Sequence, residues 1–254
     1  MFGLVNKKYA LVTGAAQGIG KAVALIYAQN GADVVICDLN EDKVKETAKE
    51  ISDETGQKCI GLKMDISDAK DVEAVVAEAL KAFGRIDIMC NSAGILIHSK
   101  MIDMQEEQWD RMFDINMKGA FLITKAVAKI MMKQNSGKIV HISSCSGKKP
   151  TVDEAAYCST KSALNGFVKV CALELGEYGI NVNAVCPGAT DTEMVRKNFI
   201  TSKAIEQEWI DKTALKKLGT VEDQAKAVLF LSSTLADHIT GEALIVSAGE
   251  MMSQ

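Results

Sequence analysis

Seven short apolar runs alternate with segments of helical pattern, and this alternation constrains the fold of the 254-residue chain more than any other feature. Strands that alternate with helices form parallel sheets, and right-handed crossovers place the helices on both faces. The sequence therefore predicts an α/β fold, a doubly wound (Rossmann) parallel sheet of about seven strands with helices on both faces. Without a linker or a break in composition, residues 1–254 are predicted to form a single domain. The predicted strands are Tyr9–Thr13, Ala32–Asp38, Cys59–Met64, Ile86–Cys90, Lys138–Ile142, Ile180–Val185 and Ala243–Ser247.

Helical spacing of apolar residues predicts long helices between these strands. Four of them are expected at Asp68–Phe83, Gln108–Lys133, about Ala155–Glu177 and Val221–Ser232. Polar motifs follow the strands directly, and the carboxyl ends of parallel strands meet at one edge of the sheet, where ligands bind. We therefore expect one site at that edge. The motifs are Gly14–Gly20, Asp38, Asp65, Asn91–Gly94, Ser143–Ser146 and Pro187-Gly188.

The glycine-rich segment Gly14–Gly20 lies between a predicted strand and a predicted helix. Glycines let the backbone approach a phosphate closely, and the first amides of the helix point at its charge. The other interpretation is a turn that needs glycine for backbone reasons alone. The next strand ends on Asp38, whose carboxylate would bind the ribose hydroxyls of a dinucleotide and repel a 2′-phosphate. No basic residue stands at Gln17, Cys37 or Leu39, so we expect NAD; Asp38 would also be compatible with capping the following helix.

Tyr157 and Lys161 are four residues apart on one predicted helix and therefore share a face. A free tyrosine has a pKa near about 10. A fixed positive charge nearby favours the phenolate and lowers that pKa, which would make Tyr157 a general acid and base. The alternative is an amphipathic surface helix with an incidental tyrosine and lysine.

Taken together, these motifs closely resemble those of the short-chain dehydrogenase/reductase family over essentially the full length of the chain. The resemblance rests on Thr13-Gly-x-x-x-Gly-x-Gly20, Asn91-Ser-Ala-Gly94, Asn116, the set Ser144, Tyr157 and Lys161, and Pro187-Gly188 with Thr190 and Thr192. It implies that Tyr157 transfers a proton to or from the substrate oxygen and that Ser144 binds this oxygen. Lys161 would lower the pKa of Tyr157 and hold the nicotinamide ribose, and Asn116 would continue a proton relay through water.

The resemblance also implies a cofactor-binding set, in which Asp65 contacts the adenine and Thr190 and Thr192 belong to the segment that holds the nicotinamide. Besides Tyr157 and Lys161, the set is Gly14, Gln17, Gly18, Ile19, Gly20, Asp38, Asp65, Ile66, Asn91, Ala93, Gly94, Pro187, Gly188, Thr190 and Thr192. Two departures stand out: Ser92 replaces a second asparagine, and Val246-Ser-Ala-Gly249 replaces Val-Asp-Gly-Gly. The second lies where the family packs its subunits, and it weakens the homotetramer that the resemblance implies.

Substrate specificity in this family lies largely in the segment after Pro187-Gly188. Residues 189–218 carry Met194, Phe199, Ile200 and Trp209 at amphipathic spacing, and we expect a substrate lid there, with packing against the body as the other interpretation. The loop before Tyr157 holds Lys148, Lys149, Asp153 and Glu154, which would meet a polar or anionic substrate or form a solvated loop.

The preferred hypothesis is an NAD-dependent oxidoreductase for a secondary alcohol or ketone, of the polyol, diol or hydroxysteroid class. The first alternative is a 3-oxoacyl-carrier-protein reductase, a class that typically uses NADPH and carries arginines that hold its acidic carrier. Asp38, and Asn135 and Tyr178 in the places of those arginines, argue against it. The second alternative, a non-catalytic dinucleotide-binding protein, is disfavoured because Tyr157 and Lys161 are both present.

Composition limits the partners and the compartment. The formal net charge is −4 without a block of like charges, so we expect neither a nucleic acid nor a membrane as partner. No apolar run approaches the roughly 18 residues of a membrane span, and no signal-peptide pattern is present. Seven cysteines without a Cys-x-x-Cys pair fit a reducing cytoplasm, and the three histidines lack metal-ligand spacing, so no metal is expected. Cys145 and Cys158 follow catalytic candidates; we expect bystanders there rather than thiols that regulate the site.

Overall fold

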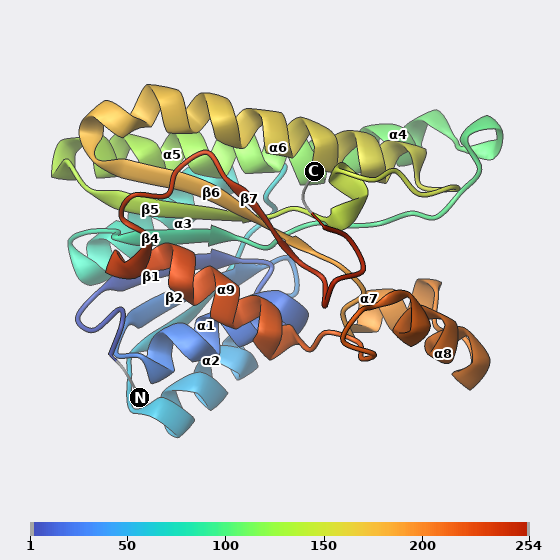
Figure 1. Cartoon of the computed structure of the whole chain (residues 1–254). Coiled ribbons are helices and arrows are strands. Elements are labelled where there is room, and N and C mark those ends of the chain that lie inside the picture. The colour runs from blue at the N-terminus through green and yellow to red at the C-terminus, as the bar shows by residue number, and fades with distance from the viewer. Residues whose placement is uncertain (1–2, 253–254) are drawn as a thin grey trace.

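A computed structural model describes residues 3–252, so the first two and last two residues of the predicted domain lie outside the described residues. Seven parallel strands form one sheet in the order β3-β2-β1-β4-β5-β6-β7 (Figure 1). The chain reverses its direction of travel across the sheet between β3 and β4, and the predicted doubly wound fold is confirmed. The strands are β1 Tyr9–Thr13, β2 Asp33–Asp38, β3 Cys59–Lys63, β4 Ile88–Asn91, β5 Gly137–Ile142, β6 Ile180–Pro187 and β7 Ala243–Val246.

Helices cover both faces of the sheet (Figure 1). Helices α1, α2 and α9 pack on one face, and α3, α5 and α6 pack on the other. Among the helices of residues 3–252, none is long and apolar enough to cross a membrane. The helices are α1 Gly18–Gln29, α2 Glu41–Thr55, α3 Ala69–Phe83, α4 Glu106–Phe113, α5 Gly119–Gln134, α6 Ala155–Leu175, α7 Glu193–Asn198, α8 Lys203–Lys212 and α9 Val221–Ser232.

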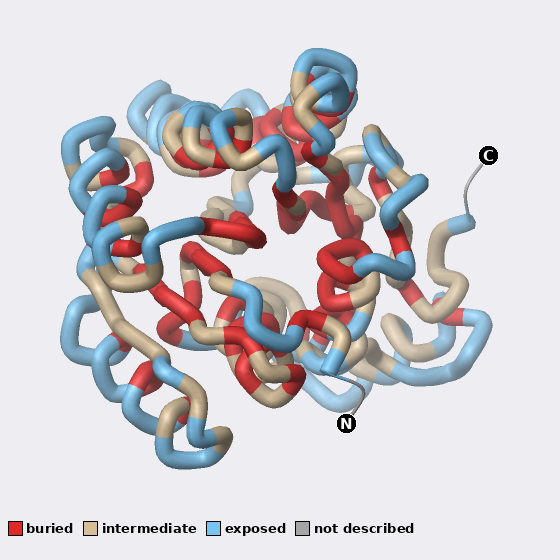
Figure 2. Tube along the Cα trace, turned by 90° about the vertical axis from the view of Figure 1, so that its left-hand side faces the viewer, coloured by how far each residue is buried: buried red, intermediate tan, exposed pale blue. Residues whose placement is uncertain are grey.

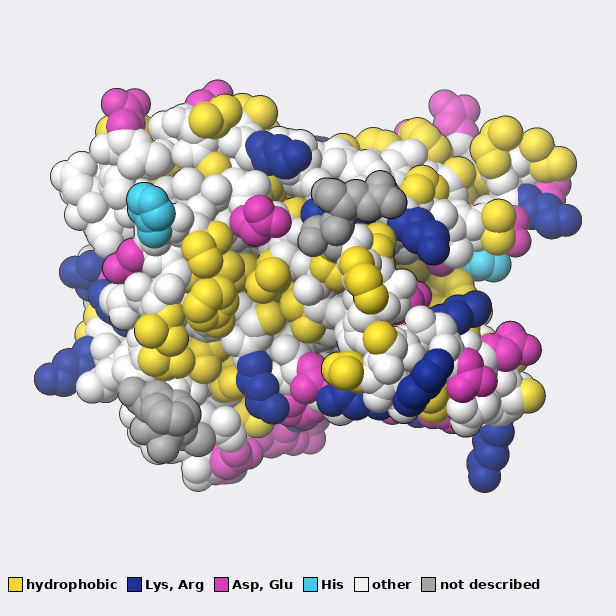
Figure 3. Space-filling view, viewed as in Figure 1, with side chains coloured by type: hydrophobic (Ala, Val, Ile, Leu, Met, Phe, Trp, Pro, Cys, Tyr) yellow, Lys and Arg dark blue, Asp and Glu magenta, His cyan; other side chains and the backbone are white. Residues whose placement is uncertain are grey.

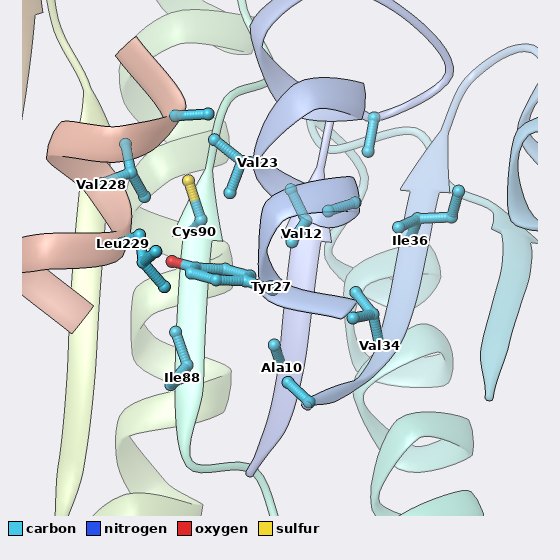
Figure 4. Close-up of a cluster of buried hydrophobic side chains, with 14 of the residues drawn as sticks. Ala10, Val12, Val23, Tyr27, Val34, Ile36, Ile88, Cys90, Val228 and Leu229 are labelled. Atoms are coloured by element: carbon cyan, nitrogen blue, oxygen red, sulfur yellow. The ribbon is translucent and has the colours of Figure 1, made fainter. Parts of the chain in front are cut away.

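Two hydrophobic cores form because alternate residues of each strand point to opposite faces. In β1, Ala10 and Val12 belong to the core under α1 and α9, whereas Leu11 belongs to the core under α3, α5 and α6. Figure 4 shows the first core, in which Tyr27 reaches across the strands towards α9. The buried hydroxyl of Tyr27 shares a 2.6 Å hydrogen bond with the hydroxyl of Ser232 on α9. The buried strands are enclosed by helices with exposed outer sides (Figure 2).

The predicted helix Gln108–Lys133 is present, but it is not a regular α-helix throughout. Helix α4 passes through a π-helical turn at Asp114–Lys118 before α5 begins. The turn presents Asn116, whose side-chain oxygen accepts a 2.8 Å hydrogen bond from the Ile95 amide. The Asn116 amide group donates to the Ile95 carbonyl at 2.9 Å and to the Thr160 hydroxyl at 3.2 Å. A π turn inserts one residue into the helical repeat, and here it directs a polar side chain into the protein.

The departure at Ser247-Ala-Gly249 has a structural consequence. Ala248 has a φ of 53°, in the left-handed region that favours glycine, and Gly249 follows with a φ of 79°. A side chain in this region costs about 1–2 kcal/mol relative to the ordinary helical conformation. The chain therefore accepts backbone strain at the position where the resembled pattern has its first glycine.

Replacing Ala248 with glycine is expected to raise the free energy of unfolding by about 0.5–1 kcal/mol, because glycine adopts a positive φ without strain. Urea unfolding would measure the change. Ala163→Gly is the matched control, since Ala163 is exposed in α6 and glycine there lowers the free energy of unfolding by about 1 kcal/mol. Destabilisation by Ala248→Gly would contradict the assigned strain.

Candidate active site

A cavity of about 1120 Å³ lies at the carboxyl edge of the sheet. The face in Figure 3 is hollowed on its right-hand side, between the segment that leads to α4 and the pair α7 and α8. Most residues predicted for the site line this cavity, although their positions in the sequence are far apart. They are Gly14, Gln17, Gly18, Ile19, Gly20, Asp38, Asp65, Ile66, Ala93, Gly94, Ser144, Tyr157, Lys161, Pro187, Gly188, Thr190 and Thr192.

Close backbone contacts explain the glycines at the start of α1. A Cβ atom at Gly14 would lie 2.7 Å from the backbone of Ala93, and one at Gly20 would lie within 2.2 Å of the Gly14 carbonyl oxygen. In the described structure Gln17, at the N-cap of α1, forms no side-chain capping hydrogen bond, and the first turn has no acidic residue. The amides of this turn therefore keep their hydrogen-bonding capacity and the positive end of the helix dipole for an anion.

Asp38 ends β2 at the wall of the cavity. Its carboxylate accepts hydrogen bonds from the amides of Ala16 at 3.2 Å and Asn40 at 3.1 Å. Asn40, not Asp38, caps α2 by accepting a 3.1 Å hydrogen bond from the Lys43 amide. Lys43 also lines the cavity, a basic side chain that sequence reasoning missed because it lies one helical turn beyond the strand end.

Asn91 and Asn116 do not line the cavity; both are buried behind it. Asn91 belongs to a chain of buried polar groups in which the Thr13 hydroxyl donates to the Asn91 side-chain oxygen at 2.5 Å and accepts from the Ala93 amide at 3.1 Å. The amide group of Asn91 lies 3.3 Å from Nδ1 of His141, so Nδ1 is the acceptor. The proton of His141 is therefore on Nε2, which donates to the Thr124 hydroxyl at 3.1 Å. The chain connects α5 to the backbone at the cavity wall.

Burial dominates the electrostatics around Tyr157. It raises the pKa of Tyr157 above its ordinary value, and a hydrogen bond with Ser144 acts in the opposite direction. Burial also lowers the pKa of Lys161 to about 8. The Lys161 ammonium donates to the Ile142 carbonyl at 2.8 Å and lies 5.6 Å from the centre of the Tyr157 ring. Desolvation of the phenol outweighs the other influences on its pKa, and the expected effect of Lys161 on Tyr157 stays a prediction.

Residues 189–218, predicted to form a lid, contain α7 and α8 and contribute aromatic residues to the cavity. Phe199 packs edge-on against His98 with 5.3 Å between ring centres, and its ring centre lies 5.4 Å from that of Trp209. Met194 lines the cavity as well, whereas Ile200 is buried away from it. The segment therefore both lines the cavity and contributes buried packing.

The loop before α6 is only partly solvated. Lys149 and Glu154 line the cavity, and Lys148 and Asp153 do not. Sequence reasoning missed several lining residues that lack a motif, notably His98 and Glu250. The Glu250 carboxylate accepts a 2.9 Å hydrogen bond from the Ala189 amide, which ties the C-terminal segment to the lid.

The cysteines beside the site have raised pKa values. Burial raises the pKa of Cys145 to about 12, and it also raises the pKa of Cys158 above its ordinary value. Because the thiolate is the reactive form, both thiols are poor nucleophiles at neutral pH, as expected of bystanders. Across the described part of the chain, no group of three or more His, Cys, Asp or Glu residues is arranged to hold a metal ion.

Asn135 and Tyr178 lie far from the cavity mouth of the protomer. Asn135 ends α5 in a left-handed conformation just before β5, and Tyr178 immediately precedes Gly179 and β6. Both are therefore at the amino-terminal edge of the sheet, opposite the cavity. Neither residue lines this cavity, and the argument from their lack of charge stays a prediction.

Comparison with known proteins identifies the family of the chain. A model of the family described as enoyl-(acyl carrier protein) reductase matches residues 14–250. The chain belongs to the short-chain dehydrogenase/reductase family, and it is an oxidoreductase.

Relatives with different activities are similar to the chain. The 3-oxoacyl-[acyl-carrier-protein] reductase FabG of Chlamydia muridarum is 37% identical over 97% of this chain and 98% of its own length. The NAD-dependent glycerol dehydrogenase of Listeria innocua is 37% identical over 96% of this chain and 94% of its own. The crystal structure of gox2181 is 33% identical with a TM-score of 0.93, covering 98% of this chain and 97% of that one. Membership of the family therefore leaves the substrate class open.

His141 generates a prediction about pH. Burial, and then the charge of Lys161, lower its pKa to about 3, whereas a histidine in the unfolded chain has a pKa of about 6.5. Between these values the unfolded state binds a proton that the folded state does not, so the free energy of unfolding falls as the pH falls through this window. We expect His141→Asn to be less stable than the original protein at pH 8. Between about pH 6.5 and 4.5, the free energy of unfolding of the original protein should fall by about 1–3 kcal/mol more than that of His141→Asn.

Urea unfolding at a series of pH values would measure the two slopes. His238→Asn is the control, because His238 is exposed and its replacement should leave the slope unchanged. Equal slopes for His141→Asn and the original protein would show that His141 is not held neutral.

Proposed function

We propose that the protein is an NAD-dependent oxidoreductase that interconverts a secondary alcohol and a ketone, of the polyol, diol or hydroxysteroid class. The observation that carries the cofactor half is Asp38, a carboxylate at the cavity wall beyond the glycine-rich turn. A carboxylate there suits ribose hydroxyls and repels a 2′-phosphate. The similar NAD-dependent glycerol dehydrogenase of Listeria innocua supports both halves of the proposal.

The residues around the cavity fit a dinucleotide. Gly14 and Gly20 have no room for a side chain, and the amides at the start of α1 would bind the pyrophosphate. Asp38 would bind the adenosine ribose, and Pro187, Gly188, Thr190 and Thr192 would hold the nicotinamide end. Bound NAD supplies the acceptor or donor of the hydride.

The proton is moved by groups of the chain itself. Tyr157 is a neutral phenol at physiological pH, because burial raises its pKa, and it is therefore in the right form to protonate the oxygen of a ketone. Ser144 would donate a hydrogen bond to the same oxygen, where negative charge develops. Lys161 would hold the nicotinamide ribose, and Asn116 would continue the proton path behind it. In alcohol oxidation Tyr157 must instead accept the proton, so oxidation should be faster at high pH.

Residues 189–218 would act as the substrate lid through Met194, Phe199 and Trp209. A small-molecule alcohol or ketone is the expected partner, in a cytoplasmic homotetramer. The exposed apolar side chains of Phe121 on α5 and Val170 and Leu173 on α6 support subunit contact.

The second candidate is a 3-oxoacyl-carrier-protein reductase, favoured by the similarity to FabG of Chlamydia muridarum. Lys43 lines the same cavity as Asp38, and its positive charge would make the 2′-phosphate of NADPH less unfavourable than it would be beside Asp38 alone. A non-catalytic dinucleotide-binding protein is disfavoured because Ser144, Tyr157 and Lys161 line one cavity together.

Initial rates with NADH and NADPH would test the proposal against ketones, keto-sugars, oxosteroids and an acetoacetyl thioester. We expect kcat/KM for a free ketone to be at least about tenfold higher with NADH, because Asp38 repels the 2′-phosphate. Asp38→Ala should reduce this preference. Turnover confined to the thioester with NADPH would instead favour the second candidate.

Tyr157→Phe is expected to lower kcat by about 10²–10⁴-fold while the Kd for NADH changes little, because only the proton-transferring hydroxyl is removed. Stopped-flow rates and NADH fluorescence would separate the two effects. Ser159→Ala is a control on the same helix: the Ser159 hydroxyl bonds only the Ala155 carbonyl among the described residues. A Tyr157→Phe variant that retained full activity would exclude Tyr157 as the proton donor.

A further inference from the structure

Glu154 is a buried carboxylate at the substrate end of the cavity. It occupies the N-cap position of α6, yet its side chain makes no capping hydrogen bond in the described structure. The residue is 4% exposed and lines the cavity. The backbone fixes its place: Ser99 forms a parallel bridge with it, and its carbonyl accepts a 2.8 Å hydrogen bond from the Cys158 amide. One helical turn separates Glu154 from Tyr157.

The surroundings of Glu154 do not neutralise it with a fixed cation. The ion pairs among residues 3–252 do not include Glu154. Burial raises the pKa of Glu154, and Ser146 and then His98 act in the opposite direction. The Cys158 sulfur lies 4.0 Å from Oε2. Burial of such a group is costly unless hydrogen-bond donors satisfy its oxygens.

The carboxylate also acts on the reacting group. Its negative charge is one cause of the raised pKa of Tyr157, after burial. Glu154 lies three residues before Tyr157 at the start of α6, and both residues line the same cavity. A substrate whose oxygen meets Tyr157 would therefore have its neighbouring carbon on the side of Glu154. A hydroxyl on that neighbouring carbon would donate to the carboxylate, an alkyl group would leave it without a donor, and a substrate carboxylate would be repelled.

We propose that Glu154 is the residue that selects substrates with a second hydroxyl next to the reacting carbon, that is, vicinal diols and polyols. This inference rests on the proposed secondary-alcohol oxidoreductase activity and narrows its substrate class. The aromatic side chains of Phe199 and Trp209 line the same cavity.

Butane-2,3-diol and butan-2-ol form a suitable probe pair, because they share the reacting carbon and differ by one hydroxyl. With NAD⁺, kcat/KM of the original protein should be at least about tenfold higher for the diol. Glu154→Gln should reduce this ratio to within about threefold. The ratio cancels any change in the pKa of Tyr157, since the change affects both substrates alike. A residue that only supports the loop would change both rates together and leave the ratio intact.

Glu193→Gln is the matched control, because Glu193 is an exposed carboxylate on the wall of the same cavity and should leave the ratio unchanged. NADH fluorescence shows whether each variant is folded, and Glu154→Asp replaces Glu154→Gln if the latter binds no NADH. Asp should also lower the ratio, because its shorter side chain withdraws the carboxylate.

A ratio near one in the original protein, or a ratio that survives in Glu154→Gln, would overturn the inference. Turnover of oxosteroids or simple ketones with NADH, without any preference for the diol, would leave the proposed function standing and reject the role of Glu154. Turnover of the acetoacetyl thioester alone, with NADPH, would reject the proposed function and the inference together.

Discussion

At the carboxyl edge of the sheet, burial shifts the pKa of several titratable groups of the site. Each of these shifts favours the neutral form of the group. Burial raises the pKa of Tyr157 and Glu154, lowers that of Lys161 to about 8 and lowers that of His141 to about 3. The common cause is desolvation, which penalises whichever form of a group carries the charge. A site built this way holds a neutral phenol ready to donate a proton. It depends on hydrogen bonds, such as those of Lys161 with Ile142, to keep its polar groups satisfied.

The fold creates this edge because all seven strands are parallel and end together. At that edge α1 begins without a side-chain cap in the described structure, so its dipole supplies positive potential without a buried cation. Asp38 supplies the opposite charge a short distance away. An anionic pyrophosphate and neutral ribose hydroxyls match this division of charge, whereas a second phosphate beside Asp38 does not. The polarity of the cavity therefore has two sources, the helix dipole that backbone direction sets and the carboxylate of Asp38.

The sequence predicted the strands to within a residue or two, because buried parallel strands are continuous apolar runs bounded by polar motifs. It missed the π turn at Asp114–Lys118, because the partners of Asn116 are Ile95 and Thr160, whose proximity only the fold reveals. The spacing between Tyr157 and Lys161 is visible in the sequence, whereas the burial that raises the pKa of Tyr157 is not.

The sequence predicts the residues of the cofactor half of the cavity better than those of the substrate half. The cofactor half consists of residues just after strands, and the strand pattern locates each one. The substrate half joins His98, Glu154 and Phe199, from three connections of different length, with Glu250 from the segment after β7, and no periodicity relates them. Glu154 is the instructive case, because in the sequence it belongs to a charged loop, Lys148–Glu154, that would ordinarily be solvated. Its carboxylate is buried only because the bridge to Ser99 draws this loop against the segment after β4, so its chemical role arises from tertiary contact rather than from a motif.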